Sequence, residues 1–123
     1  MDKLKFIAEQ MKKLSIPYAF GEWKAKIQYS YWVGEYTEET TITEDGYEES
    51  VFLLTGTHRG TWLQLEEEKN KIKDHFTTTG LRAKTDSGSI VVFFSSAQII
   101  PTGEADLKRI QINLDIKEWK GTE

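Results

Sequence analysis

The sequence contains no cysteine and only two prolines and two histidines in 123 residues. The absence of cysteine excludes disulfide bonds, thiolate zinc sites, iron–sulfur ligation and a cysteine nucleophile. No apolar run approaches the roughly 18 residues of a transmembrane helix, so the sequence predicts no membrane span. The N-terminal residues also lack the uninterrupted apolar core of a secretory signal, and we expect a chain that is intracellular at synthesis.

The sequence also lacks an excess of positive charge. Sixteen Lys and Arg stand against 20 Asp and Glu, which gives a net charge of -4. Because phosphate backbones attract basic surfaces, this balance argues against general binding to nucleic acids, and we expect no specific nucleic acid binding. Aromatic residues make up 12% of the chain, and Trp and Tyr are over-represented at protein interfaces. The composition therefore favours contact with another protein.

Catalytic and metal-binding motifs are not apparent in the sequence. No Gly-rich phosphate loop and no Gly-x-Ser-x-Gly turn occurs. His58 and His75 lie near opposite ends of one predicted helix, about 25 Å apart at 1.5 Å per residue, so they cannot share a metal ion. An EF-hand centred on Gly46 would place Thr41 and Phe52 where Asp and Glu are required. We expect no enzyme activity, no metal and no cofactor. A hydrolase using a carboxylate pair is an alternative, although the sequence singles out no pair.

Apolar residues three and four positions apart predict two helices. In residues 2–14 these are Leu4, Ile7, Met11 and Leu14, and Pro17 ends the helix. In residues 61–76 they are Trp62, Leu65, Ile72 and Phe76, and Thr61 with Gln64 forms a capping box at the start.

Five strands are predicted. Alternating polar and apolar residues indicate strands at residues 23–33 and 107–119, and a short apolar run between turns indicates one at 51–55. Residues 81–85 and 89–94 flank a turn at residues 86–88 and are predicted to form a hairpin, with the second strand buried on both faces. The order is α-β-β-α-β-β-β. Because the helices do not follow every strand, this order predicts a single α+β domain, residues 1–123, with two helices packed on one face of a mainly antiparallel sheet. Trp32 is an exception in the first strand, since it is a large aromatic residue on the polar face.

Residues 35–49 carry seven carboxylates, no base and an Asp45–Gly46 turn, which is typical of a long acidic hairpin arm or loop. Aromatic residues on or near this acidic arm are out of phase with the core. Such an arm is suited to docking on a basic, partly apolar groove of a neighbouring protein. Arg59, between two glycines, is a secondary candidate, as is Trp119. The candidate interface residues are Trp32, Glu35, Tyr36, Glu38, Glu39, Glu44, Asp45, Tyr47, Glu48, Glu49 and Arg59.

Several segments together resemble small structural proteins encoded among the tail genes of long-tailed phages and prophages of Gram-positive bacteria. These segments are residues 31–36, 43–49, 54–56, 59–62 and 101–112. The resemblance covers most of the chain and is one of overall pattern. The predicted order of helices and strands is similar to that of tail terminator or tail completion proteins.

The resemblance implies a virion protein that caps the finished tail tube as a ring of six subunits and presents its other face to the head. Its partners would be other copies of itself, the tail tube protein and the head connector protein. Its location would be the virion tail, and the bacterial host cytoplasm during assembly. Another minor tail or tube component is an alternative, although tube subunits usually have more strands and one helix. A small non-viral cytoplasmic binding module is a further alternative.

Overall fold

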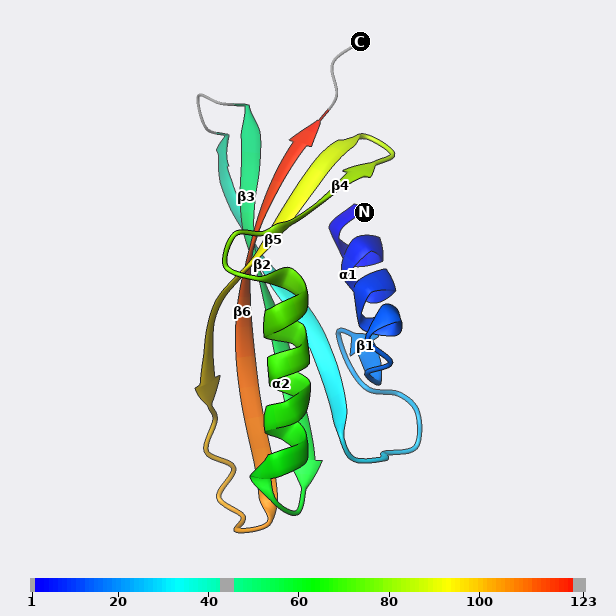
Figure 1. Cartoon of the computed structure of the whole chain (residues 1–123), viewed down its shortest axis with the longest axis vertical. Helices are drawn as coiled ribbons and strands as arrows, with labels where there is room; N and C mark the ends of the chain where they lie inside the picture. Colours follow the sequence, from blue (N-terminus) through cyan, green and yellow to red (C-terminus); the bar gives the residue numbers. More distant parts are fainter. Residues whose placement is uncertain (1, 43–45, 121–123) are drawn as a thin grey trace.

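The computed structural model describes residues 2–42 and 46–120 and has an α+β fold with two helices and six strands (Figure 1). In chain order the elements are α1 (Asp2–Lys13), β1 (Tyr18–Phe20), β2 (Tyr31–Ile42), β3 (Tyr47–Arg59), α2 (Trp62–Phe76), β4 (Leu81–Thr85), β5 (Gly88–Ile99) and β6 (Leu107–Lys120). Both helices begin and end close to the predicted positions.

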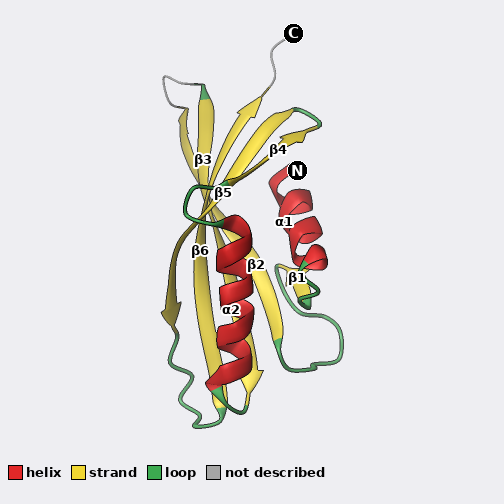
Figure 2. Ribbon diagram, in the orientation of Figure 1, coloured by secondary structure: helices red, strands yellow, loops and turns green. Residues whose placement is uncertain are grey.

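The six strands form one curled sheet in the order β1-β2-β3-β6-β5-β4 (Figure 2). All neighbouring pairs are antiparallel except β1 and β2, which are parallel. A mainly antiparallel sheet is therefore confirmed. The predicted element order is wrong by one strand, because β1 precedes β2. With three residues, β1 is too short for alternation to reveal it.

The prediction of a strand over residues 23–33 is also wrong, since β2 begins only at Tyr31. Gly21, with φ of 83°, turns the chain away from the sheet, and the segment that follows is a loop. Its alternating side chains do not face a core, and Ile27 is 52% exposed. The edge position beside β2 is taken instead by β1, which pairs with residues 32–34.

The core lies between the helices and one face of the sheet. Both helices contribute to a single cluster, α1 through Phe6, Ile7 and Met11, and α2 through Leu65, Ile72 and Phe76. Alternate residues of the central strands complete it, including Phe52, Leu54, Ile110, Ile112, Leu114 and Ile116. The other face of the sheet carries no helix (Figure 2). It receives the alternate side chains of the strands, which point away from the core.

Candidate protein-binding site

Trp32 is completely buried, so the expectation that it lies on a polar surface is wrong. The register of β2 and β3 places Trp32 opposite Gly56, where an added Cβ would lie 2.4 Å from the indole ring. The ring therefore occupies the space that the glycine leaves. Its Nε1 donates a hydrogen bond of 3.0 Å to Glu68 Oε1, and Ser30 Oγ donates one of 2.6 Å to the same oxygen. Trp32 thus joins β2 to α2 inside the molecule.

The acidic arm is the outer part of the β2–β3 hairpin. Glu35 and Glu38 pair across to Leu53 and Ser50, with an irregularity between Glu38 and Ile42. Along its other edge β3 pairs with β6 as far as Tyr47, opposite Trp119. The hairpin is therefore continuous with the sheet. Glu44 and Asp45 lie outside the described residues, and of Glu39 only the backbone, within β2, is described.

The acidic residues of the hairpin differ in their surroundings. Glu35 and Glu49 are exposed. Glu38 Oε1 lies 3.5 Å from the ammonium group of Lys3. The Lys3 side chain is buried; its ammonium group also lies 3.8 Å from Glu118 Oε1 and over the ring of Tyr36. Glu38 therefore helps to dock α1 on the sheet, while half of its side chain stays exposed to solvent.

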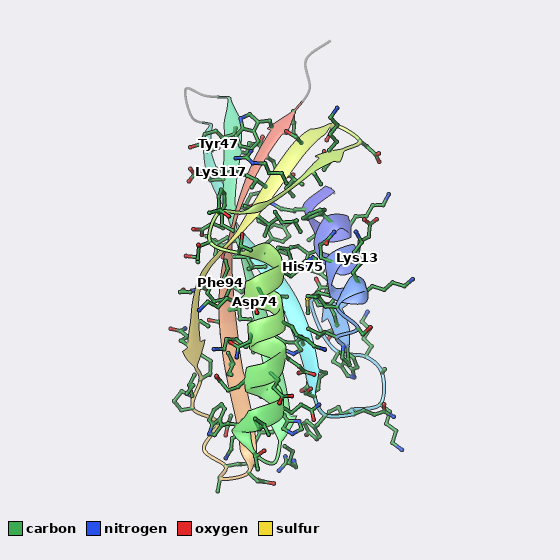
Figure 3. All side chains as sticks on the ribbon, viewed as in Figure 1. Lys13, Tyr47, Asp74, His75, Phe94 and Lys117 are labelled. Carbon is green, nitrogen blue, oxygen red and sulfur yellow. The ribbon has the colours of Figure 1, made fainter. Side chains whose placement is uncertain are left out.

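Tyr47 lies on the face of the sheet without helices, where its ring centroid is 5.2 Å from that of Trp119 (Figure 3). The ammonium group of Lys117 is 4.9 Å from the Tyr47 ring and 5.6 Å from the Phe93 ring. These half-buried aromatic rings form a continuous surface with the lysine. Lys120 Nζ lies 3.9 Å from Glu48 Oε1 at the same end. That this end of the sheet contacts another protein stays a prediction.

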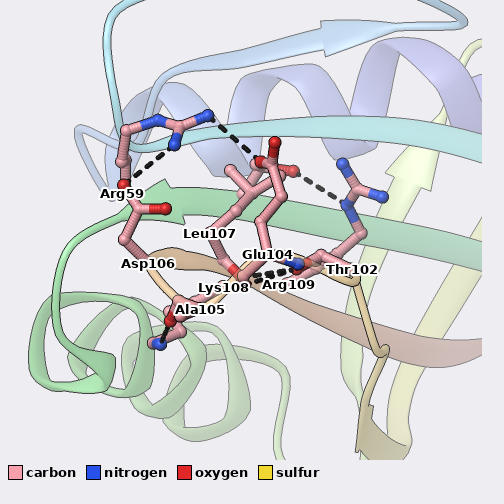
Figure 4. Close-up of polar contacts among 9 residues, drawn as sticks. Arg59, Thr102, Glu104, Ala105, Asp106, Leu107, Lys108 and Arg109 are labelled. Carbon is pink, nitrogen blue, oxygen red and sulfur yellow. Dashed lines mark hydrogen bonds and ion pairs between the residues drawn. The ribbon is translucent and has the colours of Figure 1, made fainter.

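The remaining predicted site residue, Arg59, lies at the opposite end of the sheet, where β3 pairs with the start of β6; its polar contacts are drawn in Figure 4. Its guanidinium donates to Asp106 Oδ2 at 2.9 Å and to Glu104 Oε2 at 3.5 Å. The hydrogen bond from Arg59 lowers the pKa of Asp106. Arg59 also lies over the ring of Tyr29, 5.5 Å from its centroid. The structure therefore does not bring Arg59 together with the acidic hairpin; it ties the loop before β6 to the end of β3.

Sequence reasoning missed a second apolar surface, around β1 and the loop that follows it. Phe20, Ile27 and Tyr29 are 43%, 52% and 39% exposed. A shallow pocket is lined here by Tyr18, Ala19, Phe20, Glu22, Trp23, Lys24 and Ala25. The assumption that residues 23–33 form a strand placed alternate residues in the core and hid this surface.

The middle of the helix-free face is polar and linked by side-chain hydrogen bonds. Gln98 donates to Gln111, which donates to Thr55, each at 3.3 Å. One row away, Asn113 donates to Ser96 at 2.9 Å.

The described part of the chain holds no group of three or more His, Asp or Glu side chains arranged to bind a metal ion. None of its helices is long and apolar enough to cross a membrane. Comparison with protein-family models found no match, and comparison with curated proteins found no similar protein.

Proposed function

We propose that the chain is a structural protein of a phage or prophage tail, acting as tail terminator or head–tail joining subunit by assembling as a ring on the tail tube. The sequence resemblance over residues 31–36, 43–49, 54–56, 59–62 and 101–112 suggests the tail class. The α+β fold with two helices supports the terminator role within that class, because tube subunits usually have more strands and one helix.

The observation that carries the proposal is the presence of unlike exposed surfaces at the two ends of one sheet. One end holds Tyr47, Lys117 and Trp119 beside acidic residues, and the other holds Phe20, Ile27 and Tyr29. A ring subunit contacts its two neighbours through two different surfaces, and contacts tube and head through others. A curled sheet that separates its contact surfaces meets this requirement. The mechanism is assembly: the ring stops growth of the tube and offers a docking face.

The experiment that tests this function is electron microscopy of lysates after inactivation of this gene in its source phage. Overlong tails, or complete tails separate from filled heads, are expected. Re-expression of the intact chain should restore normal particles. Normal infectious particles without the gene would contradict the proposal and favour a binding module unrelated to virions.

A further inference from the structure

The second half of β5 forms an open edge of the sheet. β4 pairs with β5 only at residues 88–92, whereas β5 continues to Ile99 with β6 on its other side. Within the described residues, no strand takes the position of β4 beyond this point. All five side chains of residues 95–99 are exposed. The edge of β5 is therefore open over residues 95–99.

The backbone of this edge has hydrogen-bonding groups directed outward. The N–H of Ile100 donates to the carbonyl of Arg109 in β6. Because antiparallel residues alternate in direction, Gln98 also faces β6, and Ala97 and Ile99 direct their N–H and C=O groups to the open side. Such groups are a template for an added strand.

The edge also lacks the features that usually prevent strand addition. Residues 95–99, Ser-Ser-Ala-Gln-Ile, contain no charge and no proline. Ile99 is 60% exposed and lines a groove with Ala97, Ile110 and residues of α2. An uncharged edge of this length with an exposed apolar side chain is expected to be covered when the protein functions.

The α2 side of the edge carries two lysines and one glutamate, Glu66. Lys69 lines the same groove as Ala97 and Ile99. Lys73, four residues later and so on the same side of the helix, has its ammonium group 5.7 Å from the Phe94 ring. Although Lys69 also pairs with Glu66 at 3.3 Å, an added strand with acidic side chains would meet two ammonium groups here.

We propose that this edge binds the acidic half of β2 from a second copy of the chain by antiparallel strand addition. The inference rests on the proposed ring and names its subunit contact. β2 lies toward the other edge of the sheet, where β1 pairs with residues 32–34 only, and it runs antiparallel to β5. On its helix-bearing face it carries Glu38, whose half-exposed carboxylate is complementary in charge to Lys69 and Lys73.

One register satisfies both strands. The backbone N–H of Trp32 donates to the carbonyl of Pro17, just before β1. Because backbone direction alternates along a strand, Glu38 also directs its backbone N–H and C=O groups to that side. Placing Ala97 beside Glu38 sets Gln98 beside Thr37 and Ile99 beside Tyr36. The helix-bearing faces of the two copies then lie on the same side of the joined sheet. Ile99 of one copy packs on the Tyr36 ring of the other, and Glu38 of the second copy approaches Lys69 of the first. Because the open edges of β5 and β2 are different surfaces, each copy can bind one neighbour through each of them. A ring results when the rotation that relates neighbouring copies closes on itself.

Disulfide trapping in the cysteine-free chain tests this contact. Thr37→Cys with Gln98→Cys places two thiols in a non-hydrogen-bonded pair between copies, where Cβ atoms are closest. Three strand spacings, about 14 Å, separate the two positions within one chain and prevent an internal bridge. Oxidation of the purified double variant should give a ladder of covalent oligomers. The control pair, Thr37→Cys with Asp86→Cys in the β4–β5 turn, should give at least tenfold less. Equal trapping by both pairs, or none by either, would overturn the inference.

Ala97→Pro in the trapping variant tests strand addition itself. It removes an outward N–H and no hydrogen bond to β6, so circular dichroism should show a folded protein while trapping falls at least tenfold. Ala97→Ser should trap normally. Should the proline variant not fold, Lys69→Glu with Lys73→Glu replaces it and should abolish trapping by charge repulsion. Persistent trapping in a folded variant of either kind would refute the contact.

The two proposals fail in different ways. Trapping of oligomers together with normal tails in the gene-inactivated phage would retain strand addition and reject the tail function. Overlong tails without trapping would retain the function and reject this subunit contact.

Discussion

At the scale of single residues, Trp32 shows how a pair of distant positions decides where a side chain lies. Its indole fits over Gly56, and its Nε1 bonds to Glu68 on α2. Neither partner is near Trp32 in sequence, and alternation alone placed the residue on the wrong face. Gly56 is therefore required for packing rather than for its backbone conformation.

Replacing Glu68 by Ala should destabilise the fold, because it removes the acceptor of both Trp32 and Ser30. Leaving a buried N–H without a partner costs about 1–3 kcal/mol. The measurement is the midpoint of urea unfolding. Glu67→Ala on the exposed side of the same helix is the matched control and should change stability little. Equal effects of the two substitutions would show that the Glu68 contacts do not stabilise the protein.

His75 makes stability depend on pH. Burial and the nearby Lys13 ammonium lower its pKa below the usual 6.5, and Nε2 lies 2.7 Å from Gln10 Oε1 (Figure 3). The unfolded chain therefore binds a proton more readily, so stability that is present above pH 6.5 is lost as the pH falls through the lowered pKa. Urea unfolding midpoints should fall across this range. Lys13→Gln should reduce the fall, and an unchanged pH dependence would exclude the Lys13 contribution.

At the scale of elements, the docking of α1 divides the acidic hairpin into structural and exposed carboxylates. Lys3 is 3% exposed and lies near Glu38 and Glu118. Burial of an ammonium group requires such partners. The negative charge of the hairpin is therefore partly balanced by Lys3. The sequence does not show this, because residues 35–49 contain no base and Lys3 lies far from them along the chain.

Glu38→Lys should destabilise the protein, because it places a second ammonium group beside buried Lys3. Glu35→Lys, on the opposite face of the same strand, should leave the thermal unfolding temperature nearly unchanged. Scanning calorimetry of the two variants measures the difference. A loss as large for Glu35→Lys would mean that the hairpin charge as a whole, rather than the Lys3 contact, stabilises the fold.

At the scale of the whole molecule, the sheet has half-length edge strands at opposite edges, with β1 covering part of β2 and β4 covering part of β5. The half-exposed carboxylate of Glu38 lies beside the open part of β2, and Lys69 of α2 lies beside the open edge of β5. This polarity suits repeated association of identical copies.

Reversing two exposed charges, Glu35→Lys with Glu49→Lys, should spare both folding and trapping, because these residues lie on the face of the sheet opposite the lysines of α2. Trapping of the parent Thr37→Cys, Gln98→Cys pair should weaken as ionic strength rises, because salt screens the contact of Glu38 with those lysines. Gel electrophoresis of oxidised samples measures both effects. A loss of trapping in the double variant, or trapping that does not change with salt, would contradict a contact between Glu38 and the lysines of α2.

The amino-acid sequence by itself determined the two helices, the β4–β5 hairpin and the long final strand. Each depends on a local period of apolar residues, and local periods do not require knowledge of the partner. The candidate hairpin was also recognisable, because its carboxylates and Asp45–Gly46 turn are consecutive in sequence. Tertiary structure alone decided the burial of Trp32, the pairing of β1 with β2, the Lys3–Glu38 contact and the open edge of β5. Each of these depends on which segments, far apart in sequence, become neighbours in the sheet, and alternation within one strand carries no information about its neighbour.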